Sequence, residues 1–423
     1  MKNRLGILLF CLFVVMIGYG LTLPVLAFYI ERLALAEGAT AQKAYIHVGL
    51  LTGVFALMQF FFAPLWGRWS DRIGRRPLFM IGLSGYAVFM ALFGIGTNLF
   101  VLYAARILGG ILSAAVLPTA SAYVADLTSE TERGKGMAWL GSAIGLGVVT
   151  GPALGAYLSR LDWHMEYRFG RFFVNDFSIP FFAAAILAVI ALLATMRFLP
   201  ESIRMPGREP HQKQSPNNSA SHPDIGWKVI RKSFLDLLVL SFLGYFALSL
   251  FEGTFALHAQ RMMNFGPSEM GLVFMVCGFI MAAAQAGVVG RFIGRVGEMP
   301  MLSLGFGLMG SALILLMTAQ TMTFILFYVV LFALGMAALN PGLASLVSKR
   351  SGKHAGAALG LQSAANSLGQ AAGPVVGSIL FTWNIHLPYL LTAVPLIVTA
   401  IIMGRKYLAG KQGDSGLRSW ISK

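Results

Sequence analysis

Two charged residues lie far from the ends of long apolar segments of this sequence. Arg106 lies within residues 99–124 and Glu252 within residues 234–257. As helical residues, both would lie about six positions, or roughly 9 Å, from the same side of a bilayer. A charge near the bilayer centre costs at least about 2.5–3.5 kcal/mol to insert, and such residues usually serve ion or substrate pathways. Since a buried carboxyl group can hold either a proton or a cation, Glu252 is the candidate for proton coupling or cation binding, with Arg106 at matching depth.

Each of these two charges also has a purely structural interpretation. Glu252 could form a static buried ion pair, and Arg106 could tie its helix to neighbouring backbone carbonyl groups. If the two were paired, Glu252 could exchange a proton only when that pairing was intermittent. The sequence leaves these alternatives open.

Uncharged polar residues inside apolar segments are further candidates, because such groups usually face the interior of a helix bundle. Gln362, Asn366 and Gln370 follow one another at intervals of one helical turn. For any single residue, a hydrogen bond between helices is the simpler role. The candidates for lining a cavity are Gln59, Asn340, Gln362, Asn366 and Gln370.

Membrane-spanning helices are the elements that must position these residues. Of the 423 residues, 57% are hydrophobic and 12% are charged, whereas soluble domains average roughly half and one quarter. A spanning helix needs about 20 apolar residues, and breaks near residues 97–98, 318–323 and 383–388 divide the longer apolar regions. We therefore predict an all-α polytopic membrane protein with about 12 transmembrane helices. The predicted spans are 5–30, 46–66, 77–97, 99–124, 137–158, 178–199, 234–257, 268–289, 300–318, 322–347, 355–382 and 387–404.

The two halves of the chain repeat one another at a fixed distance. This spacing is too long for a solenoid repeat, and in a membrane chain it indicates a transporter built from two homologous bundles. The predicted domains are a six-helix bundle at 1–199, a central loop at 200–233, a second six-helix bundle at 234–408 and a tail at 409–423. Gly67, Arg68, Arg72, Gly74 and Pro77 recur 223 positions later as Gly290, Arg291, Arg295, Gly297 and Pro300.

The formal net charge of +15 reflects topology. Basic residues are concentrated in alternate connections between the predicted spans, which places those connections and both chain termini in the cytoplasm. We therefore expect the lipid bilayer as a partner and no nucleic acid. The lysines and arginines in the connections on the other side are only Arg32, Lys43, Arg160, Arg168, Arg171 and Arg261.

The connection after the second predicted span combines glycines, arginines and one aspartate. Asp71 lies among four arginines and is therefore expected to be ionised and paired. Gly67 and Gly74 would permit a tight turn between the spans. A basic topology anchor is the alternative, but it would need neither the aspartate nor the glycines. The motif residues are Gly67, Asp71, Arg72, Gly74, Arg75 and Arg76.

A stripe of small residues marks the fifth predicted span. Gly145, Gly147, Gly151 and Gly155 recur at near-helical spacing, which lets another helix approach closely, and Pro152 bends or loosens the helix. Tight packing and a role in rocking between two states are compatible interpretations. The eleventh span repeats the pattern with Gly369, Gly373, Pro374 and Gly377.

Several of these segments resemble motifs of one known family. Segment 67–76 resembles the signature between the second and third helices of the major facilitator superfamily, and 106–110 resembles its fourth-helix arginine motif. Segment 147–155 resembles the fifth-helix motif of its drug/proton antiporters, and 200–202 the end of its sixth helix. Segment 249–254 resembles the seventh helix of bacterial quinolone and multidrug exporters, in which a glutamate is protonatable. The chain thus resembles the twelve-span drug/proton antiporters of quinolone, tetracycline and multidrug exporter type.

The resemblance implies a fold, a location and a mechanism. It implies the major facilitator fold in a bacterial cytoplasmic (inner) membrane, acting as a monomer by alternating access. Asp71, Arg75 and Asp126 would help to lock the cytoplasmic side between the halves. Exporters of this type often have a second acid in helix ten, but residues 335–339 contain none, which argues against two-site proton coupling.

We therefore predict a secondary active exporter of lipophilic or cationic drugs, run by proton antiport. Its partners would be the small-molecule substrate and protons, with no cofactor, no metal site and no enzymatic activity. An importer or symporter of a specific sugar or organic acid is the alternative, and the fifth-helix motif at 147–155 argues against it. A non-transporting receptor would leave Glu252 without a purpose.

Overall fold

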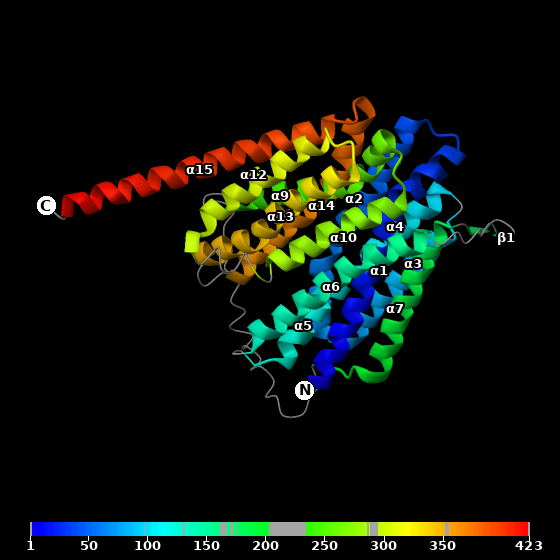
Figure 1. The fold of residues 1–423 in the computed structure, drawn as a ribbon. Coiled ribbons are helices and arrows are strands. Elements are labelled where there is room, and N and C mark those ends of the chain that lie inside the picture. Colours follow the sequence, from blue (N-terminus) through cyan, green and yellow to red (C-terminus); the bar gives the residue numbers. More distant parts are fainter. Residues whose placement is uncertain are drawn as a thin grey trace.

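The computed structural model describes residues 2–96, 98–129, 132–160, 167–169, 172–174, 176–202, 234–285, 287, 295–351 and 355–421. Most of the predicted central loop, from residue 203 to 233, lies outside these ranges. Figure 1 shows how the helices are arranged. The N-terminal half contains α1 (Lys2–Ala36), α2 (Ala41–Ile73), α3 (Arg75–Gly94), α4 (Leu99–Ser113), α5 (Val116–Leu127), α6 (Arg133–Arg160) and α7 (Ser178–Phe198). The C-terminal half contains α9 (Leu235–Met263), α10 (Pro267–Ala284), α12 (Glu298–Leu316), α13 (Met322–Ser351), α14 (Ala355–Trp383) and α15 (Leu387–Ile421).

Eleven helical stretches of the described chain are long and apolar enough to cross a membrane. α4 and α5 count together as one of them, Leu99–Leu127. The remaining long helix, α14, has 29 residues but is made more polar by its glutamines and Asn366. These helices confirm the predicted all-α polytopic fold. α15 continues beyond the predicted last span into residues assigned to a tail, and Figure 1 shows it projecting from the bundle.

The helices of the two halves pack in the same pattern. In the N-terminal half α1 packs against α6, and α3 packs against α4 and α7. In the C-terminal half α9 packs against α14, and α12 packs against α13 and α15. Two pairs that are equivalent under the duplication join the halves: α2 with α14, and α10 with α6. The structure is therefore two related bundles held together by reciprocal helix pairs.

The two halves meet near one end of the helices. We call this end, where α2 begins and α9 ends, the hairpin face, and the opposite end, near the N-terminus, the terminal face. A Cβ on Gly49 of α2 would lie 2.4 Å from the carbonyl oxygen of Pro374, and one on Gly271 of α10 would lie 2.3 Å from the Cβ of Ala156. Figure 1 shows the bundles joined near the β1 label and diverging toward the terminal face.

The glycine stripe of α6 packs against α1 within the N-terminal half. A Cβ on Gly147 would lie 2.4 Å from Met16 Cβ, and one on Gly151 would lie 2.5 Å from the Ile17 carbonyl oxygen. Gly145, which the sequence placed in the same stripe, has open space around its Cβ position. The spacing of 145 and 147 differs from a helical turn, so the two glycines face different directions. In α14, Gly369, Gly373 and Gly377 approach α9 in the same way.

The turn between α2 and α3 depends on one glycine instead of the predicted two. α2 runs on to Ile73, well past the predicted span, so Gly67 is a helical residue. Gly74 makes the turn with φ +120°, a conformation that side chains with a Cβ rarely adopt. A Cβ there would also lie 2.5 Å from Glu201 Oε2. The predicted span ended where the apolar residues end, near residue 66, whereas the helix continues through the polar residues 67–73.

The predicted fourth span is divided into two helices. α4 ends at Ser113, and α5 begins at Val116, two residues before Pro118. A proline removes a backbone donor and disfavours helical geometry in the residue before it. The equivalent Pro341 lies inside the continuous α13. Nothing in the local sequence accounts for this difference between the halves.

The segment 159–177, for which the sequence offered no structure, contains a short hairpin. β1 (Tyr167–Phe169) pairs antiparallel with β2 (Phe172–Val174), with Tyr167 opposite Val174. It projects beyond the helices at the hairpin face (Figure 1). It is a small addition to an otherwise helical fold.

The glycine stripe gives a prediction about α6. Gly151→Ala should lower the thermal unfolding midpoint of the purified protein and reduce the drug efflux that the sequence predicts, because its new methyl group overlaps the backbone of α1. Overpacking of this kind costs typically about 1–3 kcal/mol. Gly145→Ala, in the same helix but facing open space, is the matched control and should leave both quantities near wild type. Equal behaviour of the two variants would contradict the packing described here.

Candidate functional site

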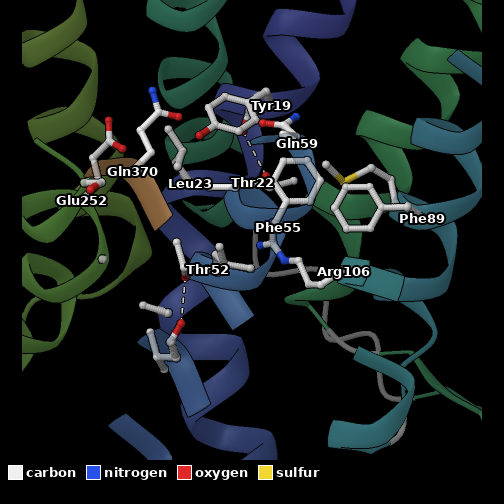
Figure 2. A pocket seen from close by; sticks show the side chains of 17 residues that line it. Tyr19, Thr22, Leu23, Thr52, Phe55, Gln59, Phe89, Arg106, Glu252 and Gln370 are labelled. Atoms are coloured by element: carbon white, nitrogen blue, oxygen red, sulfur yellow. Dashed lines mark hydrogen bonds between the residues drawn. The ribbon is translucent and has the colours of Figure 1, made fainter. Parts of the chain in front are cut away.

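A cavity of about 800 Å³, including its open mouth, lies between the two halves. Helices α1, α2, α3 and α4 of the N-terminal half form one part of its wall, and α9 and α14 of the other half complete it. Figure 2 shows its labelled side chains pointing inward. The residues that line it are Tyr19, Thr22, Leu23, Leu26, Ala27, Val48, Thr52, Phe55, Ala56, Gln59, Phe89, Met90, Arg106, Ser249, Glu252, Gly253 and Gln370.

Arg106 enters this cavity from a cage of aromatic rings. Its guanidinium carbon lies 5.2 Å from the ring centroid of Phe55, 5.4 Å from Phe89 and 4.8 Å from Phe93. The side chain is only 6% exposed, and a desolvated cation over a ring gains about 2 kcal/mol or more. Three rings are therefore sufficient to offset an insertion cost of about 2.5–3.5 kcal/mol. The predicted tie to neighbouring backbone carbonyl groups is not among the hydrogen bonds of the described residues.

The two glycines that follow Arg106 by three and four residues make the aromatic cage possible. A Cβ on Gly109 would lie 2.4 Å from Phe89 Cγ, and one on Gly110 would lie 2.9 Å from the Phe55 carbonyl oxygen. Since residues three and four apart share a helix face, these glycines admit the rings beside the arginine. The glycines of the fourth-helix motif thus make room for the rings that pack around one buried cation.

Glu252 lies on the opposite wall of the same cavity, beside Gln370 (Figure 2). In the part of the chain that the structure describes, no salt bridge or hydrogen bond joins Glu252 to Arg106, so the static ion pair is not formed. The predicted matching depth stays a prediction, because the helix ends do not mark the bilayer boundary. Arg106 lies seven positions after Leu99, where α4 begins, whereas Glu252 lies eleven positions before Met263, where α9 ends. The apolar segment ends near residue 257, but α9 continues through polar residues.

Of the five uncharged polar candidates, the structure places two in the wall of the cavity. Gln59 and Gln370 line the cavity. Gln362 is 4% exposed and is not part of its wall, and the buried Asn366 Oδ1 has no hydrogen-bond partner among the described residues. Asn340 is exposed and also lies outside the wall. The aromatic residues of α2 and α3, which the sequence analysis did not single out, contribute more to the cavity than these amides.

The charged motif at the junction of α2 and α3 forms a network inside the N-terminal half. Arg75 lies 2.6 Å from Asp71 Oδ1, and its Nε lies 3.1 Å from Asp126 Oδ2, which joins the start of α3 to the end of α5. Asp126 also accepts a 2.8 Å hydrogen bond from the Ser202 hydroxyl group. These contacts connect elements of one half. A lock between the halves stays a prediction for a conformation in which the terminal face is closed.

Glu201 completes this network by capping α3. Its carboxylate accepts hydrogen bonds from the backbone N–H groups of Arg75 and Arg76 at 2.9 and 3.2 Å, where a negative charge is favoured by the helix dipole. The Arg76 guanidinium donates to the Met196 carbonyl oxygen at 2.5 Å. Arg72 is exposed. The motif 200–202 thus holds the start of α3, which the sequence alone could not indicate.

The C-terminal half has an ion pair at the equivalent place with its charges reversed. Glu298 begins α12 and Lys349 lies near the end of α13, and the two form a salt bridge. Each is 223 positions after its counterpart, Arg75 or Asp126. Glu298 also accepts a 2.8 Å hydrogen bond from the Ser345 hydroxyl group. Both halves therefore join the same two elements by an ion pair, with opposite polarity.

A third polar cluster joins the two halves at the hairpin face. The Arg261 guanidinium of α9 donates a hydrogen bond to the Tyr45 hydroxyl group of α2 and lies 5.2 Å from the centroid of that ring. The Tyr45 ring packs edge-on against Phe381 of α14, with centroids 5.0 Å apart. Glu31, 8% exposed, interacts electrostatically with Arg261. Sequence analysis missed this cluster because its residues come from α1, α2 and α9 and meet only when the halves are joined.

Comparison with known sequences identifies the family. The sequence profile of the Major Facilitator Superfamily matches residues 8–319 and 286–419. The chain belongs to this superfamily. It is 30% identical over 399 residues to Multidrug resistance protein 2 of Bacillus subtilis (strain 168), covering 94% of this chain and 93% of the relative. It is 24% identical over 418 residues to Quinolone resistance protein NorA of Staphylococcus aureus (strain COL), covering 99% and 100%.

Solved structures of this superfamily share the fold. The human organic anion transporter MFSD10 (TETRAN) superposes with a TM-score of 0.66 at 23% identity, covering 95% of this chain and 99% of that one. A D-xylose-proton symporter superposes with a TM-score of 0.71 at 16% identity, covering 95% and 97%. At such identities the likeness establishes the two-bundle architecture alone.

The cluster at the hairpin face gives a prediction about conformational equilibrium. Arg261→Met should shift the population toward states with that face open, because it removes the hydrogen bond and the cation–ring contact that Arg261 makes with Tyr45 of the other half. The distance between spin labels on Gln42→Cys and Trp383→Cys, in a protein with Cys11 and Cys277 replaced by alanine, would report this shift.

Arg32 supplies a matched control for this experiment. It lies at the same face, 5.4 Å from the Phe177 ring centroid, but both residues belong to the N-terminal half. Arg32→Met should therefore leave the label distances unchanged. If Arg261→Met does so too, the cluster does not hold the halves together.

The reversed ion pair gives a prediction about stability. Lys349→Glu places two carboxylates side by side at the end of α13 and should lower the thermal unfolding midpoint, with loss of the pair and added repulsion. The exchange Glu298→Lys with Lys349→Glu restores attraction and should recover most of the loss. A double variant no more stable than Lys349→Glu would show that the pair contributes through packing alone.

Proposed function

We propose that this chain is a secondary active exporter of lipophilic and cationic drugs that uses proton antiport and alternating access. The observation that carries the proposal is a carboxyl group, Glu252, that has no ionic partner among the described residues and lies in a cavity between the two halves. The relatives named above as multidrug and quinolone resistance proteins support the same direction. We also propose that the protein is a monomer in a bacterial inner membrane, with both termini in the cytoplasm. We propose no enzymatic activity for it.

Competition at Glu252 supplies the coupling. An ionised Glu252 attracts a cation that enters from the terminal face, which is the cytoplasmic face in the proposed orientation. When the hairpin face opens, protons from the more acidic exterior neutralise the carboxyl group and the cation leaves. Return to the cytoplasm-facing state releases the proton and restores the site. Each step requires only that the two ligands exclude one another at one carboxyl group.

The surrounding wall explains a preference for lipophilic compounds. Leu23, Leu26, Phe55 and Phe89 provide apolar surface, and removing such surface from water gains about 25 cal/mol per Å². Such burial is non-directional, so it admits different shapes. Directional recognition is left to a few polar groups. This division of roles suits a transporter that accepts many compounds.

The two-state cycle uses the polar contacts at both faces. The Arg261–Tyr45 contact favours the conformation with the hairpin face closed. The network of Arg75, Asp71 and Asp126 is available to favour closure of the terminal face. A substrate shifts such an equilibrium only by its difference in affinity for the two states. We therefore assign the closing contacts to opposite faces and the substrate to the cavity between them.

Replacement of the carboxyl group tests this proposal. Glu252→Gln mimics the protonated state and should abolish efflux of ethidium from cells with an imposed inward proton gradient, with expression preserved. In the purified wild-type protein, ethidium should bind more weakly as the pH falls, because protons compete for Glu252. In Glu252→Gln this pH dependence should disappear.

Glu132→Gln is the matched control, because Glu132 is exposed at the terminal face and the substitution is the same. It should export ethidium at the wild-type rate. Wild-type efflux by Glu252→Gln would mean that the coupling acid lies elsewhere. Radiolabelled uptake of sugars or organic acids by the wild type, without efflux, would favour the importer instead.

A further inference from the structure

The backbone hydrogen bonding of the fourth span changes where α4 and α5 meet. The backbone N–H of Ala115 donates at 3.2 Å to the carbonyl oxygen of Leu112, three residues earlier, instead of to Ile111, four residues earlier. Pro118 has no N–H group, so the carbonyl of Ala114 also lacks its usual helical partner. Three-residue bonding of this kind within a longer helix often marks a functional hinge. The break is therefore a place where the helix can take up a second arrangement.

A tryptophan of α2 binds the backbone acceptor that the break leaves. The indole Nε1–H of Trp66 donates at 2.6 Å to the carbonyl oxygen of Ile111, the acceptor that the N–H of Ala115 does not use. The Trp66 side chain is buried and packs in one cluster with Ala114 and Ala115. Helices bend where a side chain enters the ladder of backbone hydrogen bonds. We therefore assign the position of the break to Trp66.

The duplicated half shows that proline alone does not produce the break. Pro341 is the equivalent of Pro118, yet α13 continues through it. The residue 223 positions after Trp66 is Val289, whose side chain has no hydrogen-bond donor. The half with the indole donor has the break, and the half without that donor has a continuous helix. The difference between the halves thus follows a residue of another helix, outside the local sequence.

The break separates two charged groups that the proposed cycle uses differently. α4 carries Arg106 into the cavity, whereas α5, at the terminal face (Figure 1), carries Asp126, which pairs with Arg75. Two buried hydroxyl groups, Ser113 Oγ and Thr119 Oγ1, flank the break without a hydrogen-bond partner among the described residues. A buried hydroxyl group without a partner costs free energy, and helical serine and threonine can donate to the carbonyl four residues earlier. A second arrangement of the break that pairs these hydroxyl groups would recover that cost.

We propose that Trp66 is the positioning residue of a hinge, on which α5 swings relative to α4 as the terminal face opens and closes. With the terminal face open, the indole holds the bent form. With that face closed, Ala115 donates to Ile111 instead and the fourth span becomes continuous, as α13 is. In the part of the C-terminal half that the structure describes, α13 has no such break, so we expect that half to move as one body. This inference rests on the proposed function, because alternating access supplies the movement.

A distance inside the N-terminal half would report the movement of α5. The helix has 12 residues, which is a length of about 18 Å. A swing of about 20°, the size of a distinct kink, moves its end by about 6 Å. Spin labels on Ser129→Cys, just after α5, and Met196→Cys, near the end of α7, are both at exposed positions. They would be placed in a protein with Cys11 and Cys277 replaced by alanine.

A wedge at the hairpin face supplies the change of conformation. A Cβ on Gly49 would overlap the backbone of α14, so Gly49→Leu should force the halves apart there and close the terminal face. We expect the Ser129–Met196 label distance to change by about 6 Å. Labels on Ser348→Cys of α13 and Lys406→Cys of α15 form the matched pair in the C-terminal half. Their distance should stay the same, because α13 is continuous.

Removal of the indole donor tests Trp66 itself. Trp66→Phe keeps an aromatic ring but loses the N–H group, so it should shift the population about fivefold toward the continuous form. The Ser129–Met196 label distance should move in the same direction as in Gly49→Leu, and ethidium efflux should slow. Trp69→Phe is the matched control, because Trp69 is exposed, touches the Trp66 ring edge-on and has no indole hydrogen bond among those of the described residues. It should leave the distance and the efflux near wild type.

The outcomes separate the hinge from the proposed function. An unchanged label distance in the N-terminal half of Gly49→Leu, with the hairpin face shown to be open by the labels described above, would mean that this half is rigid and would overturn the hinge. An unchanged distance in Trp66→Phe, or an equal shift in Trp69→Phe, would overturn the assignment to the indole. If one variant does not fold or does not change conformation, the other decides. A moving hinge without ethidium efflux would contradict the proposed exporter alone, and efflux with a rigid half would contradict the hinge alone.

Discussion

Close contact between the halves near the hairpin face is the constraint on which the rest of the structure depends. At Gly49 and Gly53 of α2, and at Gly271 of α10, a Cβ would overlap atoms of the opposite half. Because the backbones approach so closely there, the two bundles can be joined at that face and diverge toward the other. The cavity is the space that this divergence leaves. Without those small residues the halves would have to separate at both ends.

Glycine also sets the electrostatics of the cavity. Gly109 and Gly110 let Phe89 and Phe55 reach Arg106, and the rings then keep a cation in a nearly dry position, with no carboxylate of the described residues paired to it. A paired arginine would have neutralised the cavity wall. The cage therefore leaves the field of Arg106 available to a ligand. In the other half, Gly253 packs against Pro374 next to Glu252, so both charges are held beside tightly packed helix crossings.

The sequence was sufficient to predict the helices and to single out the two cavity charges, because hydropathy and the cost of burying charge are local properties. Helix ends were less accessible. α2 and α9 extend beyond their apolar segments, which places Gly67 in a helix and Glu252 further from the end of its helix than its apolar segment suggests. Contacts between helices that are distant in the chain could not be predicted from the sequence. Tyr45 and Arg261 each look ordinary in sequence, and only the joined halves bring them together. The aromatic cage was missed for the same reason, since its rings come from α2 and α3.

The reversed polarity of the two terminal-face ion pairs limits how the halves can be recombined. In each half the pair joins the start of one span to the end of the following span, through Arg75 of α3 and Asp126 of α5 or through Glu298 of α12 and Lys349 of α13. A chimera that replaced α12 by α3 alone would set Arg75 against Lys349, and the reciprocal graft would set Glu298 against Asp126. Exchange of both helices together avoids this repulsion. The smallest unit that can be transplanted between the duplicated halves is therefore the helix pair, which also means that any reversal of the pair since the duplication required both positions to change.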